Sequence, residues 1–194
     1  MRDQLTGLSV SVDGCNVIAS CCPDRHSRTC KLKKYTTHGR LVRDIRLPTD
    51  VVKLSHAVQL TVRFFVVCHG VWSEDRIHGV SIVDVDGRVM RTCSGPAGGP
   101  MAGGLTVAVE LRRMTCPRRI AVDGNGAVLV TDQDNKRVLL LNQSLTDVRE
   151  LVTLRDVGRP SWKPFSLFLD EAGGRLIIGD RENGETVVFR VRDS

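Results

Sequence analysis

The stretch that decides the fold is Ile120-Ala-Val-Asp-Gly-Asn-Gly-Ala-Val-Leu-Val-Thr-Asp-Gln-Asp-Asn-Lys-Arg-Val-Leu-Leu-Leu-Asn142. Its apolar residues form short runs bounded by Asp, Gly and Asn, which is typical of strands joined by turns. The tight turn at Asp123–Gly126 needs a residue with positive φ. A polar loop at 133–137 leads to a third strand, and a fourth is expected at 148–154. The stretch therefore predicts a four-stranded antiparallel meander.

The same unit recurs along the chain. We expect four blades at about 8–47, 51–95, 117–157 and 165–191, the second opening with a strand at 51–55. Residues 96–116 are rich in glycine and are expected to form an insertion between two blades. Four repeats of this length, each with four strands, indicate a β-propeller with one sheet per blade. The predicted fold class is therefore all-β, with residues 1–194 forming a single propeller region.

The segment Pro117–Val138 resembles an NHL repeat. The matching positions are Pro117, the apolar trio before Asp123, Gly126, the strand ending in Asp132, then Asn135 and Arg137. Arg119 stands where glycine is common in that family, and Lys136 stands where histidine is common. The segment 164–191 matches the repeat less well. The two N-terminal blades share only its succession of strands and turns, without the motif residues.

The resemblance implies a β-propeller, usually six-bladed, of the kind found at the C-terminus of tripartite-motif ubiquitin ligases. Such propellers bind protein or RNA partners. The family's catalytic part is a RING with B-boxes, and no residues here match its zinc ligands. We therefore expect a non-catalytic chain. About four blades fit in 194 residues, so we expect a piece of a longer protein or an open arc.

The aspartates of the repeat have a structural and a catalytic interpretation. Asp123, Asp132, Asp170 and Asp180 close the first and second strands of two blades at regular positions. We expect them to accept hydrogen bonds from turn amides, because aspartate does this well. We expect Arg137 to hold its loop against a neighbouring blade.

Composition and cysteine usage limit the class of protein. The chain is 41% hydrophobic and 26% charged, and no window is long and apolar enough for a membrane helix. Seven cysteines, an odd number, without a signal peptide favour reduced thiols and a cytoplasmic location. The spacing of Cys21, Cys22, His26, Cys30 and His38 fits no common zinc site. We therefore predict no metal and no cofactor.

Partner binding is expected where the loops between second and third strands meet the connections between blades, since propeller loops carry function. Arginine and tryptophan residues gather in these segments, and both residue types suit protein hot spots and nucleic-acid contact. The residues expected to bind a partner are Arg25, His26, Arg28, Trp72, Arg76, Arg112, Arg113, Arg118, Arg119, Lys136, Trp162, Lys163 and Arg181.

Three functions are consistent with this pattern. The first is a scaffold that binds a protein partner. The second is an RNA-binding propeller, suggested by residues 25–46, where eight basic residues accompany the single acid Asp44. The third is a propeller lyase or hydrolase, disfavoured because the five histidines all lie at or before His78.

Overall fold

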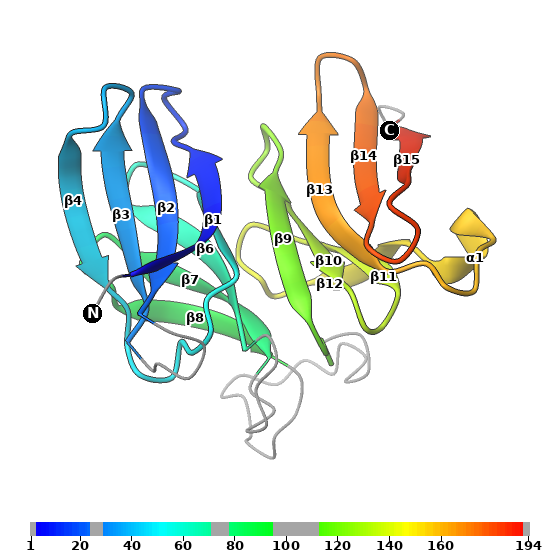
Figure 1. Cartoon of the computed structure of the whole chain (residues 1–194), viewed down its shortest axis with the longest axis horizontal. Coiled ribbons are helices and arrows are strands. Elements are labelled where there is room, and N and C mark those ends of the chain that lie inside the picture. The colour runs from blue at the N-terminus through cyan, green and yellow to red at the C-terminus, as the bar shows by residue number, and fades with distance from the viewer. Residues whose placement is uncertain (1–2, 24–28, 71–77, 95–112, 192–194) are drawn as a thin grey trace.

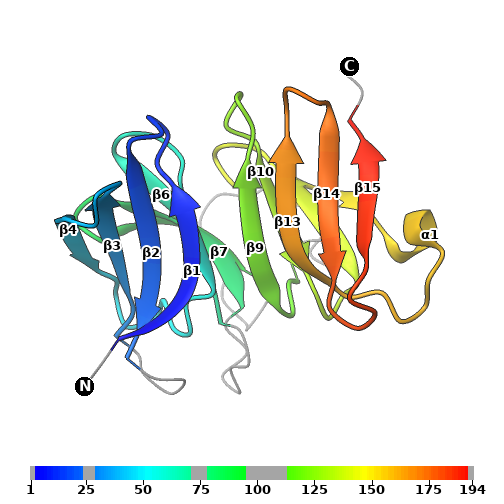
Figure 2. The same cartoon turned by 45° about the horizontal axis from the view of Figure 1, so that its top comes forward.

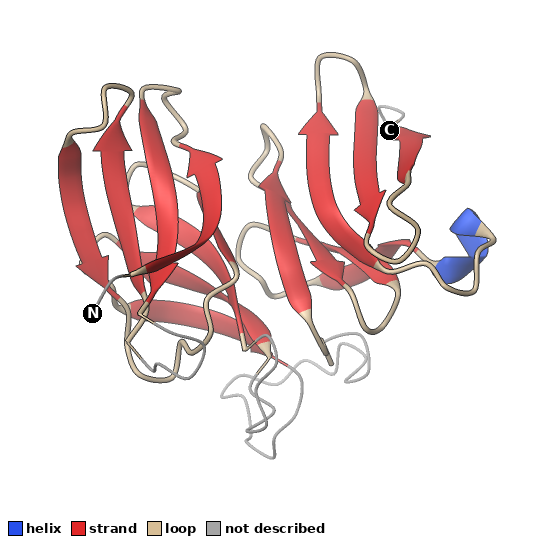
Figure 3. Ribbon diagram, viewed as in Figure 1, coloured by secondary structure: helices blue, strands red, loops and turns tan. Residues whose placement is uncertain are grey.

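The computed structural model describes residues 3–23, 29–70, 78–94 and 113–191, which form an all-β structure (Figures 1 and 3). Its first eight strands are β1 (Gln4–Val10), β2 (Asn16–Cys22), β3 (Lys31–Thr36), β4 (Leu41–Arg46), β5 (His56–Gln59), β6 (Phe64–His69), β7 (Gly79–Asp84) and β8 (Val89–Ser94). The later elements are β9 (Pro117–Val122), β10 (Val128–Asp132), β11 (Arg137–Leu141), β12 (Val148–Val152), the short helix α1 (Leu154–Val157), β13 (Pro164–Asp170), β14 (Arg175–Asp180) and β15 (Thr186–Arg190).

The strands form four antiparallel meanders, each in the order of the sequence. Strands β1–β4, β5–β8 and β9–β12 make four-stranded sheets, and β13–β15 make a three-stranded sheet among the described residues. We call these sheets blades 1 to 4. They follow one another along an arc, with blade 1 and blade 4 at its ends (Figures 1 and 2). The four-bladed β-propeller predicted from the sequence is thus confirmed.

One local prediction was wrong, and one short element was not predicted. The first strand of blade 2 is β5 at His56–Gln59, whereas the sequence pattern placed it at 51–55. Val51 and Leu54 are apolar because they lie buried in the contact between blades 1 and 2, without joining the sheet. The helix α1 was not expected, since four residues carry too little periodicity to detect. Most of the expected insertion at 96–116 lies outside the described residues.

Apolar contacts between neighbouring blades form the core. Ile18 and Leu32 of blade 1 pack with Phe65 and Val67 of blade 2 in one cluster. Further clusters join blade 2 to blade 3 and blade 3 to blade 4. Strands β10 and β6 are covered on both faces, which explains their continuous apolar runs. Each blade thus needs a neighbour to bury its apolar face.

Buried His56 connects the first strands of three blades. Its Nε2 lies 3.0 Å from the carbonyl oxygen of Leu8 in β1, and its Nδ1 accepts the amide hydrogen of Ile120 in β9 at 3.3 Å. This pattern requires the neutral ring, with the proton on Nε2. Burial lowers the pKa of His56 to about 4. Gly7 allows the close approach, because a Cβ there would lie 2.8 Å from the His56 ring.

The expectation that every cysteine is reduced was wrong for one pair. Cys22, the last residue of β2, forms a disulfide with Cys30, just before β3. Cys15, Cys21, Cys68, Cys93 and Cys116 are free thiols. Sequence spacing could not indicate this bond, because the β2–β3 hairpin is what places the two residues side by side.

Candidate partner-binding site

One end of the propeller gathers the loops expected to bind a partner. In three blades, the residue after the second strand donates its amide hydrogen to a carbonyl before the first strand. The donor–acceptor pairs are Gly70–Val52 at 2.8 Å, Gln133–Cys116 at 3.1 Å and Arg181–Lys163 at 3.0 Å. The second-to-third-strand loops and the connections into the blades therefore share one end, which we call the loop face.

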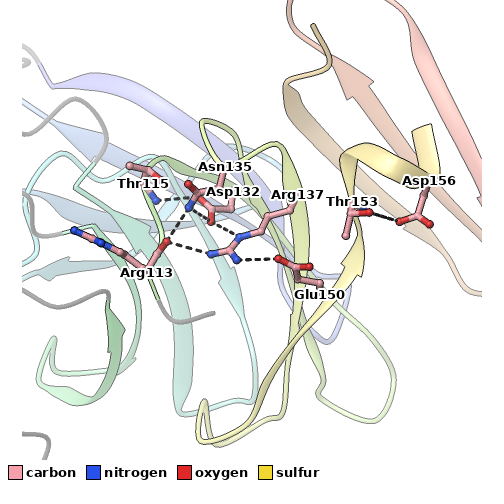
Figure 4. A network of polar contacts seen from close by, with 8 residues as sticks. All are labelled: Arg113, Thr115, Asp132, Asn135, Arg137, Glu150, Thr153 and Asp156. Atoms are coloured by element: carbon pink, nitrogen blue, oxygen red, sulfur yellow. Dashed lines mark hydrogen bonds and ion pairs between the residues drawn. The ribbon is translucent and has the colours of Figure 1, made fainter. Parts of the chain in front are cut away.

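Asp132 organises the loop face of blade 3 (Figure 4). Its carboxylate is fully buried at the end of β10. One oxygen, Oδ1, accepts the amide hydrogens of Thr115 at 2.9 Å and Cys116 at 3.4 Å. The other, Oδ2, accepts from Asn135 Nδ2 at 2.8 Å and from Arg137 Nε at 2.9 Å. All these contacts are structural, as expected for an aspartate that fixes a turn.

Arg137 holds its loop within its own blade. Besides Asp132, its guanidinium contacts Glu150 of β12 at 3.0 Å and the carbonyl oxygen of Arg113 at 3.1 Å (Figure 4). Asn135 donates to the same carbonyl at 2.7 Å. These contacts join the loop to β12 and to the segment leading into β9, and a contact of Arg137 to a neighbouring blade stays a prediction.

Blade 4 repeats half of this network. Buried Asp180 accepts the amide hydrogens of Lys163 at 3.1 Å and Glu182 at 3.0 Å, and the Nδ2 of Asn183 at 2.6 Å. Burial opposes ionisation, but these hydrogen bonds outweigh it and lower the pKa of Asp180. Glu185 occupies the place that Arg137 has in blade 3, so the repeat lacks its arginine.

Blades 1 and 2 use other residues at the end of the second strand. Blade 2 has buried His69, whose Nε2 lies 2.9 Å from Ser81 Oγ. Blade 1 has Cys22, and its disulfide to Cys30 closes the β2–β3 loop covalently. These substitutions explain why the two N-terminal blades share only the succession of strands and turns of the repeat, without its motif residues.

The two remaining repeat aspartates also fix turns, at the opposite end of the propeller. Asp123 Oδ1 accepts the amide hydrogens of Asn125 at 3.0 Å and Ala127 at 2.7 Å. Gly126 has a φ of 81°, the positive value expected for this turn. Asp170 Oδ1 accepts the amide hydrogen of Gly173 at 2.9 Å. Asp123 and Asp170 thus accept hydrogen bonds from turn amides, as the sequence predicted, whereas the amides bound by Asp132 belong to the segment leading into β9.

Three arginines converge on Phe165 at the loop face. Arg118 and Arg119 lie near the start of β9, Phe165 lies near the start of β13, and Arg181 follows β14. The guanidinium carbons lie 5.5, 5.6 and 6.0 Å from the centre of the Phe165 ring. We call these four residues the arginine cluster. Guanidinium groups over an aromatic ring are favourable, and they present several hydrogen-bond donors to an approaching anion.

Protein contacts hold two of these arginines in place. Gln133 Oε1 accepts from Arg118 Nε at 2.8 Å, and Arg119 Nη1 contacts the carbonyl oxygens of Ser55 at 3.3 Å and Arg118 at 3.2 Å. Burial lowers the pKa of Arg118, and the nearby charges of Arg181 and Arg119 add to this effect. Like charges are therefore held close together in a half-buried position.

The other predicted site residues have varied environments. Trp162 was expected on the surface, and this was wrong: it is fully buried between blades 3 and 4. Lys136 has a left-handed φ of 54° and donates to the carbonyl oxygen of Pro160. Lys163 pairs with Glu182 at 2.8 Å. The side chain of Arg113 is exposed. The predicted residues outside the described part of the chain are Arg25, His26, Arg28, Trp72, Arg76 and Arg112.

The described part of the basic stretch 25–46 lies on blade 1, away from the arginine cluster. Lys33 contacts Asp3 at 2.5 Å, and Lys31 lies 3.9 Å from the same carboxylate. This pairing neutralises part of the positive charge that the sequence suggested for phosphate contacts.

In the described residues, no three His, Cys, Asp or Glu side chains gather as metal ligands. No helix among them is long and apolar enough to span a membrane.

Solved structures share this fold. A Bacteroides caccae protein of unknown function matches with a TM-score of 0.67 and 16% identity over 97% of this chain and 64% of its own. The nidogen/laminin complex matches with a TM-score of 0.64 and 15% identity, covering 96% of this chain and 60% of that one. The Myceliophteria thermophila Cps50 (Swd1) β-propeller domain matches with a TM-score of 0.58 and 14% identity, covering 97% and 52%.

These similarities establish the β-propeller fold. Virginiamycin B lyase from Staphylococcus aureus also shares it, with a TM-score of 0.52, 14% identity and coverage of 96% of this chain and 55% of the lyase chain. The fold therefore occurs in an enzyme and in a propeller of a protein complex. The chain spans less than two thirds of each of these structures. Protein-family models and curated sequences gave no match.

Proposed function

We propose that this chain is a non-catalytic scaffold that binds a protein partner through its loop face. The observation that carries the proposal is the arginine cluster, whose guanidinium groups are positioned by the rigid strands of two blades. Acidic Asp134 and Glu182 belong to the same loops, so the face has mixed charge. Mixed polar surfaces with arginine are typical of protein interfaces.

A similar solved structure is a protein complex. It is that of nidogen with laminin, and this chain is similar to one of its chains. The NHL-like motif at Pro117–Val138 supports a finer proposal: the substrate-recognition part of a ubiquitin-ligase-type protein. In that proposal the RING and B-boxes belong to another part of a longer protein.

RNA binding is the second candidate, favoured by the basic stretch 25–46. The pairing of Lys31 and Lys33 with Asp3 weakens it. A lyase or hydrolase is the least supported candidate, because His56 is buried with both ring nitrogens in structural contacts and His69 is buried with its Nε2 on Ser81 Oγ. The cytoplasmic location stays a prediction, and the Cys22–Cys30 disulfide weakens the reduced-thiol argument behind it.

The test is selection of binders from a random peptide library displayed on phage, beside a random single-stranded RNA pool titrated across a salt series. Binding of each selected ligand is measured on three proteins. These are the wild type, a loop-face variant (Arg113→Ala, Lys163→Ala and Arg181→Ala) and a control variant with equal charge loss at the opposite end (Arg40→Ala, Arg63→Ala and Arg190→Ala).

Peptides that lose affinity in the loop-face variant and keep it in the control support the proposal. RNA that binds with a steep salt dependence, while no peptide is selected, would replace it with the RNA-binding function. Peptides that bind both variants as well as the wild type would contradict the loop face as the interface.

A further inference from the structure

We propose that the arginine cluster is a receptor for an oxyanion, a carboxylate or phosphoryl group, carried by a side chain of the bound peptide segment. This inference rests on the proposed function and specifies the chemistry of the partner. The cluster combines residues from both blades 3 and 4, so the site exists only where the two blades meet.

The cluster concentrates positive charge. Three guanidinium groups lie within 6.0 Å of one ring centre, and Arg118 is half-buried among them. Like charges at such distances repel each other, and partial burial reduces the screening by water. The charge of Asp134 acts favourably on Arg118, and the charge of Arg181 helps to lower the pKa of Glu182, which is itself paired with Lys163. A bound oxyanion would offset the repulsion among the three guanidinium groups.

The cluster is also preorganised. Gln133 fixes Arg118 through its Nε, and the carbonyl of Ser55 fixes Arg119 through its Nη1. The backbone around them is also fixed, because Ser55 Oγ donates to the Arg118 carbonyl at 2.8 Å and Thr131 Oγ1 accepts from the Arg119 amide at 3.0 Å. Little side-chain entropy remains to be lost when an anion binds, and guanidinium donors suit the paired oxygens of carboxylate and phosphate.

The surroundings of the cluster suit a peptide better than a nucleic acid. Single-stranded RNA is held by bases stacked on exposed aromatic rings. The Phe165 ring is engaged by guanidinium groups, and Trp162, which precedes it in the sequence, is fully buried. The described loop face around the cluster thus supplies charge without a stacking platform, and charge alone suits an acidic or phosphorylated peptide.

The experiment uses three fluorescent peptides of one length: an oligoglutamate, a phosphoserine peptide and an oligoglutamine. Their binding is measured by anisotropy at low and high salt, with a uridine oligonucleotide as a further probe. The cluster variant is Arg119→Gln with Arg181→Gln, which removes charge while keeping polar side chains. The matched control is Arg190→Gln with Arg63→Gln, which removes equal charge at exposed positions of the opposite end.

We expect the glutamate and phosphoserine peptides to bind and the glutamine peptide to fail. The cluster variant should lose about tenfold or more in affinity, since each lost contact is a hydrogen bond to a charged group. The relative affinity of the two anionic peptides identifies the preferred oxyanion. Thermal unfolding of both variants, matched to the wild type, shows that the loss is local.

Three results would overturn the inference. The glutamine peptide could bind as well as the anionic ones, the control could lose as much affinity as the cluster variant, or the uridine oligonucleotide alone could bind. If the library instead selects neutral peptides that bind the loop face, the proposed function stands and the oxyanion receptor fails. The two proposals therefore fail separately.

Discussion

Lowering the pH should destabilise this protein through His56. The neutral ring of His56 joins β1, β5 and β9, and protonating Nδ1 would remove its hydrogen bond from the Ile120 amide. Its pKa is lowered from 6.5 to about 4 in the folded protein, so the unfolded chain binds the proton more tightly. Stability is therefore full above pH 6.5 and falls as the pH drops toward 4.

The magnitude follows from the two pKa values. At about pH 5 the His56 side chain is almost fully protonated in the unfolded chain and mostly neutral in the folded protein. The free energy of unfolding is therefore lower by about 2 kcal/mol at about pH 5 than at about pH 8. Buried His69, with a pKa also lowered to about 4, adds a similar loss. The carboxylates whose pKa values are lowered respond at still lower pH, so they contribute little in this window.

The assay is urea unfolding at about pH 8 and about pH 5, applied to the wild type and to His56→Gln. Glutamine cannot titrate, so the pH-dependent loss should shrink by about 2 kcal/mol in the variant, whatever its stability at the higher pH. His69→Gln should behave in the same way. An equal pH dependence in the wild type and His56→Gln would refute the reasoning, because the proton would then be taken up elsewhere.

Three further changes test the packing. Asp132→Ala should cost about 3–5 kcal/mol in urea unfolding, because it removes the buried carboxylate that accepts hydrogen bonds from two backbone amides, Asn135 and Arg137; a cost below about 1 kcal/mol would contradict the network. Replacing Cys22 and Cys30 by serine should cost about 2–3 kcal/mol, and thiol titration of the unfolded, non-reduced wild type should find five free thiols instead of seven. Gly87→Ala should lower the melting temperature more than Gly39→Ala, since both have positive φ and an added Cβ meets a carbonyl oxygen of β4 only at Gly87. Equal shifts would contradict that contact.

Much of the propeller was predictable because strand periodicity and turn residues are local signals. The Asp123–Gly126 turn and the strand ending at Asp132 lie where the short apolar runs and the turn residues between them placed them. The blade boundaries were less accurate. Val51 and Leu54 carry the apolar signal of a strand, yet their burial comes from packing between blades. A local apolar pattern indicates that a residue is buried, but it does not indicate which part of the protein covers that residue.

The candidate site was predictable in part. Arginines in the loop and connection segments marked Arg118, Arg119 and Arg181 as candidates, and these three do lie together. Phe165 was missed, because a phenylalanine at the start of an apolar strand carries no sign that its ring will meet charged groups. Trp162 gave the opposite error, since its polar neighbours in the sequence suggested exposure and the contact between blades 3 and 4 buries it.

The sequence by itself determined the all-β repeat, the aspartate-closed turns and the excess of arginine in one set of loops. These features depend on residues within one or two strands of each other. Only the tertiary structure decided that Arg118, Arg119 and Arg181 share one aromatic ring, that Cys22 bonds to Cys30, and that His56 joins three blades. Those contacts depend on how hairpins close and how blades stack, which no single repeat specifies.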